Sequence, residues 1–179
     1  MKDTKTSERY AQGFLDAFQP KDLQELLLEV RVLLEILQTN SDIMKILSSH
    51  NVKNEEKVTI LEPFITNTKF DEYWQNLMML LAEKGRFNLL DEIISILERY
   101  ILGELNIVKV TIKTAHQLAT EMKEKMVTFI ASKVNKSIEP TFVVEPAVLG
   151  GFIAESDNFI VDSSVQRSLE QFRLSLIKM

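Results

Sequence analysis

Along roughly the first hundred residues, apolar positions recur at intervals of three and four, the spacing that places them on one face of an α-helix. Polar clusters such as Thr39–Ser41, and Gly85 as a helix C-terminal signal, interrupt this pattern. The stripes predict six helices, over Glu8–Phe18, Pro20–Leu37, Asp42–Leu47, Asn54–Pro63, Thr66–Lys84 and Leu90–Ile101. Ser7 is the expected N-cap of the first helix. Leu28, Val32 and Ile36 lie off the main stripe of the second helix, which predicts that this helix is covered on more than one side.

After Gly103–Asn106, apolar residues recur at every second position. This segment is the expected boundary between two domains, residues 1–104 and 105–179. Val108, Val110 and Ile112 alternate with lysine and threonine, which predicts a half-buried strand. A helical pattern, a strand, a hairpin and a last helix follow, over Leu118–Val134, Ile138–Val144, Gly151–Asp162 and from Val165 onward. The expected fold class is mainly α, with a six-helix N-terminal bundle followed by a small α+β domain.

The segment from Phe142 to Leu176 contains the most abrupt change of period in the chain. Gly150 and Gly151 are adjacent glycines in an apolar context, which predicts a bulge or a close approach of two backbone segments. Two short apolar runs separated by Ser156-Asp157 predict a β-hairpin with a polar turn.

The two serines after this hairpin are predicted to cap the last helix. Ser163, with Gln166 three residues later, fits a capping box, and Ser164 is the alternative cap one residue on. Asp162 adds a negative charge that stabilises a helix N-terminus. No histidine lies near either serine in the sequence, so a hydrolase nucleophile is not supported.

Composition and charge exclude several classes of function. The 179 residues contain no Cys, two His and a formal net charge of −5. Thiolate chemistry is therefore excluded, and a multi-histidine metal site would need further ligands than His50 and His116, both expected in loops. The negative charge disfavours nucleic-acid binding. The N-terminus resembles neither a secretory signal nor a transit peptide, and no apolar run approaches the ~18–20 residues of a membrane span.

Two features remained as candidates for chemistry or binding. Glu155 and Asp157 flank the predicted turn, where carboxylates are normally solvated, so acid/base catalysis there is disfavoured. Ala11, Gly13 and Ala17 make the first helix thin. Close packing inside the bundle is the favoured reason from the residues alone, and a groove for a partner helix is the alternative.

Three motifs give the chain a resemblance to a known family. Arg9–Phe14 (RYAQGF) is similar to the family's N-terminal opening, in which Gly13 replaces the commoner alanine. Asn76–Leu90 is similar to its junction between the fifth and sixth helices. Leu149–Leu169 carries a pair of glycines, a hairpin and the pattern Asp-x-Ser-Val, which makes Ser164 the matching serine. In this order and spacing, the motifs resemble the delta subunit of bacterial F-type ATP synthase, the counterpart of the mitochondrial oligomycin sensitivity-conferring protein.

The resemblance implies a non-catalytic stator subunit of a proton-translocating ATP synthase. Such subunits join the catalytic head to the b subunits of the peripheral stalk, so that rotor torque drives ATP synthesis. The helical domain of the family binds the N-terminal helix of an alpha subunit, and the C-terminal domain meets the b subunits. No cofactor, nucleotide or metal is expected in the subunit itself. The implied location is the cytoplasmic side of a bacterial cell membrane, peripheral and without a membrane span.

The resemblance also implies which residues bind. It places a groove between the first and fifth helices and so favours the partner-groove explanation of the thin first helix. The expected groove residues are Tyr10, Gly13, Phe14, Ala17, Asn76, Leu77 and Leu80, of which Phe14 and Leu77 fit the bundle core equally well. Gly150, Gly151, Asp162 and Ser164 form the expected structural signature of the C-terminal domain.

Two rival interpretations come from other classes of protein. One is a small enzyme that uses Glu155 and Asp157, and the other is a helical adaptor unrelated to ATP synthase. Within the family, a plastid or mitochondrial origin is the nearer alternative to a bacterial one.

Overall fold

A computed structural model of the chain describes residues 4–49, 52–66 and 68–177. The chain divides into two compact units, Met1–Leu105 and Asn106–Met179. Across the described ranges the fold is mostly helical, with eight α-helices and one small sheet of four strands, so the mainly α class is confirmed. His50, predicted to lie in a loop, falls outside the described residues.

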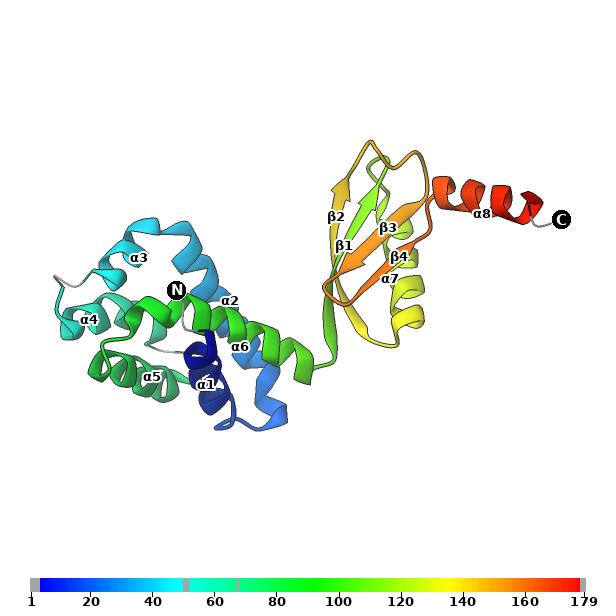
Figure 1. Cartoon of the computed structure of the whole chain (residues 1–179). Coiled ribbons are helices and arrows are strands. Elements are labelled where there is room, and N and C mark those ends of the chain that lie inside the picture. Colours follow the sequence, from blue (N-terminus) through cyan, green and yellow to red (C-terminus); the bar gives the residue numbers. More distant parts are fainter. Residues whose placement is uncertain (1–3, 50–51, 67, 178–179) are drawn as a thin grey trace. The chain divides into compact units, whose positions relative to one another are not determined.

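The first unit is built from helices (Figure 1). Their buried side chains are mostly apolar and form its core. In chain order they are α1 (Thr4–Leu15), the 3-10 turn η1 (Pro20–Asp22), α2 (Leu23–Thr39), α3 (Ser41–Ser48), α4 (Asn54–Ile65), α5 (Asp71–Glu83), the 3-10 turn η2 (Phe87–Leu89) and α6 (Leu90–Glu104). The stripes predicted from the three-and-four spacing supply this core, which includes the fully buried Leu26, Val30, Trp74, Leu81, Ile93 and Leu97. Burial of these side chains is the main force that holds the unit together.

Several predicted helix ends are wrong, because tertiary partners decide them. Ser7 is not an N-cap: it lies inside α1, is fully buried, and its hydroxyl donates to Glu92 on α6 (3.0 Å). Pro63 does not end α4, which continues to Ile65. Thr66 belongs to the end of α4, because its N–H and its hydroxyl both donate to the Glu62 carbonyl (2.9 and 2.7 Å). The fifth helix therefore begins only at Asp71.

The second side of α2 is open. Leu28 and Val32, which lie off the main stripe, are 64% and 53% exposed. The prediction that α2 is covered on more than one side is therefore wrong for this chain by itself. The apolar residues of the main stripe, from Leu23 to Leu37, are buried as predicted, and Ile36, which also lies off the stripe, is half-buried.

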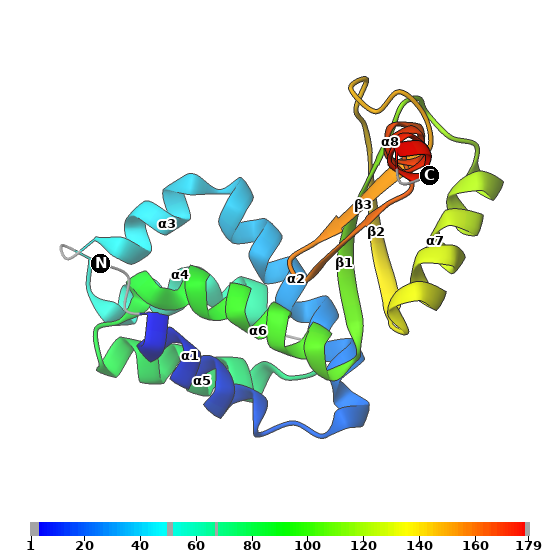
Figure 2. The same ribbon diagram turned by 45° about the vertical axis from the view of Figure 1, so that its right-hand side comes forward.

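The second unit is a small mixed sheet with a helix on one face. Its elements are β1 (Ile107–Thr114), α7 (Thr120–Val134), β2 (Ser137–Val144), β3 (Phe152–Ser156), β4 (Phe159–Asp162) and α8 (Val165–Ile177). The strand order is β2-β1-β3-β4. β1 and β2 are parallel and are connected through α7, whereas β3 pairs antiparallel with both β1 and β4. α7 lies along one face of the sheet (Figures 1 and 2).

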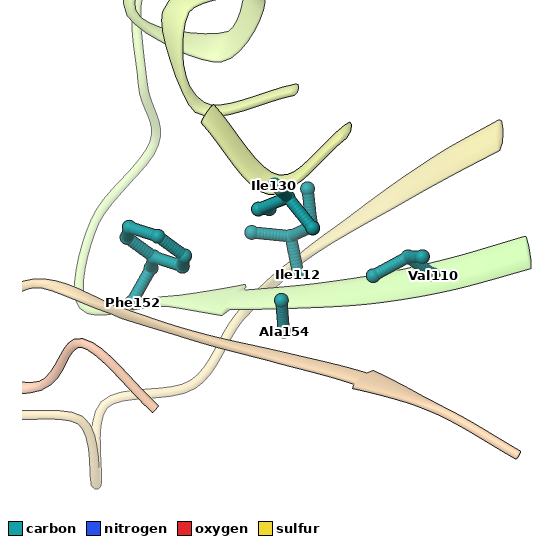
Figure 3. Close-up of a cluster of buried hydrophobic side chains, with 5 residues drawn as sticks. All are labelled: Val110, Ile112, Ile130, Phe152 and Ala154. Atoms are coloured by element: carbon teal, nitrogen blue, oxygen red, sulfur yellow. The ribbon is translucent and has the colours of Figure 1, made fainter. Parts of the chain in front are cut away.

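The alternation along β1 places its apolar side chains beneath α7. Val110 and Ile112 of β1 meet Ile130 of α7 and Phe152 and Ala154 of β3 in a cluster that excludes water (Figure 3). The predicted hairpin is confirmed, because β3 and β4 pair from Ile153↔Asp162 to Ser156↔Phe159. This register shifts the two-residue turn by one position from the prediction, to Asp157-Asn158.

Candidate partner-binding groove

α1 and α5 lie side by side in opposite directions, and aromatic contacts join them. At one end, the ring of Phe18, which follows α1, lies 4.7 Å from the ring of Tyr73 at the start of α5 (centroid distance). In the middle, Phe14 lies 4.6 Å from Trp74. At the other end, Arg86, which follows α5, donates to the Tyr10 hydroxyl (3.3 Å). The two helices therefore form the sides of one elongated surface.

A groove of about 670 Å³ runs along this surface. It is lined by Thr6, Arg9, Tyr10, Gly13, Phe14, Ala17, Tyr73, Asn76, Leu77, Leu80 and Arg86. All seven residues that the family resemblance assigned to a groove are among them. Their positions are three and four apart along each helix, so each helix contributes one continuous face.

The floor of the groove is part of the core, and its rim is open. Phe14 and Leu77 are 8% and 5% exposed, so each is both a core residue and a floor residue. Tyr73 and Leu80 are each 41% exposed on the rim. Because a floor that packs against a buried Trp74 cannot rearrange freely, the groove is preformed.

Gly13 leaves the groove open in the middle of α1. A Cβ placed on Gly13 meets no atom within 4 Å. The interpretation that Gly13 is small because another helix of the chain packs closely on it is therefore wrong. Ala11, in contrast, is fully buried and does serve close packing. A partner helix can therefore approach the backbone of α1 closely at Gly13 and contact the exposed Ala17.

Arg86 reaches the groove because of how α5 ends. Gly85 has φ +62°, a left-handed conformation that glycine adopts at no steric cost. The N–H of Arg86 bonds to the Leu81 carbonyl (2.9 Å) and that of Gly85 to the Ala82 carbonyl (3.1 Å), which is a Schellman motif. The motif turns the chain back, so the guanidinium of Arg86 lies over the Tyr10 ring (5.9 Å).

The sequence reasoning missed four lining residues: Thr6, Arg9, Tyr73 and Arg86. Two signals were available for them. Thr6 and Arg9 are four and one positions before Tyr10 on the same helix face, and Tyr73 is three before Asn76. Arg86 directly follows Gly85, the C-terminal signal of the fifth helix.

The signature residues of the second unit hold the start of α8 against the start of β3. Gly151 has φ +77°, and a Cβ there would lie 2.2 Å from the Ser163 carbonyl oxygen, so glycine is required. The N–H of Val165 bonds to the Gly150 carbonyl (3.0 Å). Of the two predicted explanations, a close backbone approach is what the glycine pair provides; the pair precedes β3 and does not form a bulge within a strand.

Ser164, rather than Ser163, occupies the N-cap of α8. Its Oγ accepts from the N–H of Arg167 (3.2 Å), the bond expected of an N-cap. The carboxylate of Asp162 accepts from the N–H of Ser164 (2.9 Å). Hydrogen bonds from the hydroxyl and the N–H of Ser164 hold the pKa of Asp162 below its ordinary value of 3.8, because they favour the charged carboxylate.

α8 leaves this cap and extends away from the sheet (Figures 1 and 2). Its apolar side chains recur at helical spacing and are exposed: Val165, Leu169, Phe172 and Leu176. Leu169 is 62% exposed. A helix of 13 residues has little stability in water by itself, so an apolar face of this kind is a second candidate contact surface.

Glu155 and Asp157, the two carboxylates of the enzyme alternative, have different surroundings. Glu155 pairs with Lys113 across the β1–β3 ladder (2.6 Å), whereas Asp157 is exposed in the hairpin turn. His116 is exposed in the connection after β1, as predicted. In the part of the chain that the structure describes, no group of three or more potential ligand side chains is arranged to hold a metal ion. No helix there is both long and apolar enough to cross a bilayer.

An apolar groove between two helices and an exposed amphipathic helix are surfaces typical of a protein that binds other polypeptides. The model of the family described as ATP synthase delta (OSCP) subunit matches residues 6–176. The chain therefore belongs to the ATP synthase delta (OSCP) subunit family.

Similar proteins agree with this assignment. The chain is 29% identical over 174 residues to ATP synthase subunit delta of Lactobacillus gasseri, covering 96% of this chain and 94% of that protein. It is 28% identical over 172 residues to the protein of the same name from Pelodictyon phaeoclathratiforme, covering 96% of each. A chain in the cryo-EM structure of the Toxoplasma gondii mitochondrial ATP synthase hexamer has the same fold, with a TM-score of 0.65, 15% identity, and coverage of 96% of this chain and 97% of that one.

Proposed function

We propose that this chain is a non-catalytic stator subunit of a proton-translocating F-type ATP synthase and that it links the catalytic head to the peripheral stalk. The single observation that carries the proposal is the groove between α1 and α5 in a chain of this family. A subunit that resists rotor torque needs a binding surface for each of the two parts that it joins. The groove and the exposed face of α8 are two such surfaces, one in each unit.

In this proposal the first unit is a six-helix bundle that receives the N-terminal helix of an alpha subunit. Helix-in-groove binding needs apolar anchors at helical spacing and a groove that they fill. Phe14 and Leu77 supply the apolar floor, and Gly13 supplies room for close approach. Because the floor of the groove is already packed, most of the conformational entropy lost on binding comes from the alpha-subunit helix as it becomes ordered.

The second unit binds the C-terminal part of the b subunits, and α8 is the element that we assign to this contact. Its exposed leucines would be buried against an apolar segment of b, which would also stabilise the helix. Ser164 and Gly151 then serve the contact indirectly, because they fix the direction in which α8 starts.

The proposed location is the cytoplasmic side of a bacterial cell membrane, where the protein is held through its partners. Co-purification of the chain with alpha and beta subunits from membranes is the expected result. Recovery of a folded chain free of these subunits would favour the unrelated helical adaptor instead.

The alpha contact is tested by a matched pair of substitutions. Gly13→Leu fills the groove, whereas Gly103→Leu makes the same change at a position of α6 that is also open and outside the groove. Both changes favour helix, because glycine costs about 1 kcal/mol relative to good helix formers. In titration calorimetry with a peptide of the alpha N-terminus from the same organism, Gly13→Leu should weaken binding at least about tenfold and Gly103→Leu should not. Equal affinities for the two folded variants would refute the groove assignment.

The b contact is tested on α8. Leu169→Asp places a charge on the apolar face, and Gln171→Asp places the same charge on an exposed polar position of the same helix. A pull-down with the C-terminal segment of b should lose the first variant and retain the second. Retention of both would remove α8 from the proposed contact.

A further inference from the structure

The groove carries the opposite charge from the chain as a whole. The chain has a formal net charge of −5, yet the residues that line the groove include two arginines, Arg9 and Arg86, and no acidic residue. The nearest carboxylates along α1 have other contacts: Glu8 pairs with Arg99 (4.0 Å), and Asp16 accepts from Gln12 (2.7 Å). The positive charge of the groove is therefore not neutralised by its own lining.

Both arginines lie at the same end of the groove. Arg9 is next to Tyr10 in α1, and Arg86 bonds to the Tyr10 hydroxyl (3.3 Å). The far end, at Ala17 and Tyr73, has no charged lining residue. The groove is thus apolar along its floor and cationic at one end only.

We infer that the helix bound in this groove carries a carboxylate side chain at one end, which lies between Arg9 and Arg86 and sets the direction in which the helix binds. The inference rests on the proposed function, because it takes the alpha N-terminal helix as the occupant. Guanidinium groups bind carboxylates through paired, charge-assisted hydrogen bonds of defined geometry. A reversed helix would leave the carboxylate at the apolar end, without a charged partner.

Apolar burial and the arginine contacts should contribute differently to binding, because the first is buried in the floor and the second lies at one end of the groove. Apolar burial along Phe14 and Leu77 supplies most of the affinity, whereas the arginine end selects among helices with similar apolar faces. Rim charges act chiefly on the rate of association and on its dependence on salt. The N-terminal helix of the alpha subunit should therefore bind more weakly as the salt concentration rises, but at the same site in the groove.

The test uses the full chain and the alpha N-terminal peptide. The double variant Arg9→Gln, Arg86→Gln should bind the peptide about three- to tenfold more weakly than the unchanged chain, with a smaller dependence on salt. Lys45→Gln is the matched control, because Lys45 is an exposed cation of the same unit outside the groove. Far-UV circular dichroism and Trp74 fluorescence verify that each variant is folded.

Peptides in which each acidic residue is changed to its amide complete the test. One such change should weaken binding to the unchanged chain and have no further effect on the double variant, as expected of a coupled pair. The inference is overturned if the arginine variant binds within about twofold of the unchanged chain at every salt concentration. If that happens while Gly13→Leu still weakens binding at least about tenfold, the proposed function stands and only the charge pairing fails. If the unchanged chain does not bind the peptide at all, the proposed function fails too.

Discussion

The groove between α1 and α5 is a concave apolar surface supported by a core, whereas α8 is a convex apolar surface whose first turn is held against the start of β3. Phe14 in the groove is 8% exposed, and Leu169 on α8 is 62% exposed. Both surfaces come from the same three-and-four spacing of apolar residues. The same pattern can therefore form a groove that binds a helix or an exposed helix that needs a partner. Which of the two forms depends on the helices and strands that pack against it.

The difference predicts two kinds of binding. The groove is preformed, so a partner that enters it meets fixed walls. α8 has few contacts of its own, so it gains order when a partner covers it. Substitutions near the groove should change both the stability of the first unit and binding, whereas substitutions on the exposed face of α8 should change binding alone.

Of these substitutions, Gly151→Ala should have the largest effect on stability, because it disturbs the junction that supports α8. The added Cβ would lie 2.2 Å from the Ser163 carbonyl at a φ that alanine rarely adopts, so the junction of β3 and α8 must shift. We expect a loss of about 2–4 kcal/mol in the second unit. Trp74, the only tryptophan, lies in the first unit and should report an unchanged transition there, while circular dichroism reports the loss.

Gly150→Ala is the matched control for this substitution. A Cβ at Gly150 would lie 3.0 Å from a methyl carbon of the Val165 side chain, which is less confined than a carbonyl. The control should be markedly milder. Equal losses for the two variants would contradict the close-approach account of Gly151.

Ser7→Ala should weaken the support of the groove. The buried hydroxyl of Ser7 donates to Glu92 on α6, so its removal leaves a carboxylate with one fewer partner and loosens α1. We expect a loss of about 1–3 kcal/mol in the first unit, measured by denaturation followed through Trp74 fluorescence. Ser95→Ala, on the exposed side of α6, is the control and should be nearly neutral. A Ser7→Ala variant as stable as the unchanged chain would show that the Ser7–Glu92 hydrogen bond does not support α1.

Ser164→Ala should shorten α8 at its supported end. Loss of an N-cap costs about 1 kcal/mol, and here it removes the bond from the Arg167 N–H. Amide hydrogen exchange should therefore become faster in the first turn of α8 and stay unchanged in the first unit. Ser163→Ala, one residue earlier, should leave exchange in α8 as it is. The reverse result would make Ser163 the cap.

The smallest expected effect is the pH dependence of the same junction. Because hydrogen bonds from Ser164 lower the pKa of Asp162, the charged carboxylate stabilises the folded junction above its ordinary pKa of 3.8, and this contribution is lost as the pH falls through the lowered value. Asp162→Asn should accordingly destabilise the second unit slightly at neutral pH and have no effect at the acid end. Thermal melts at both pH values test this, with Asp157→Asn in the exposed turn as the control.

The sequence predicted the elements better than their ends. Apolar spacing located the helices, the alternation in β1 and the hairpin of β3 and β4, because each pattern reports which face is buried. It failed at Thr66, the expected start of the fifth helix, whose hydroxyl donates to the Glu62 carbonyl at the end of α4. It also failed at Ser7, the expected N-cap, whose hydroxyl donates to Glu92 on another helix. Local propensity contains no information about such a partner 85 residues away.

The groove was predictable only in part. Gly13 and Ala17 marked a thin helix face, but the residues alone favoured internal packing, and the family resemblance was needed to pair α1 with α5. Arg86 could not be found from periodicity, because it lies beyond the helix, where the left-handed Gly85 turns the chain. The exposed face of α8 was also hidden, since a pattern of apolar residues does not tell whether anything covers them.

The most direct test of the stator account is to map the alpha N-terminal peptide on the full chain by NMR of methyl groups. Bound peptide should shift the methyl signals of Ala17, Leu77 and Leu80 in the groove and leave those of Val110 and Ile112 in the core of the second unit unchanged. Shifts confined to the second unit, with none in the groove, would contradict the account.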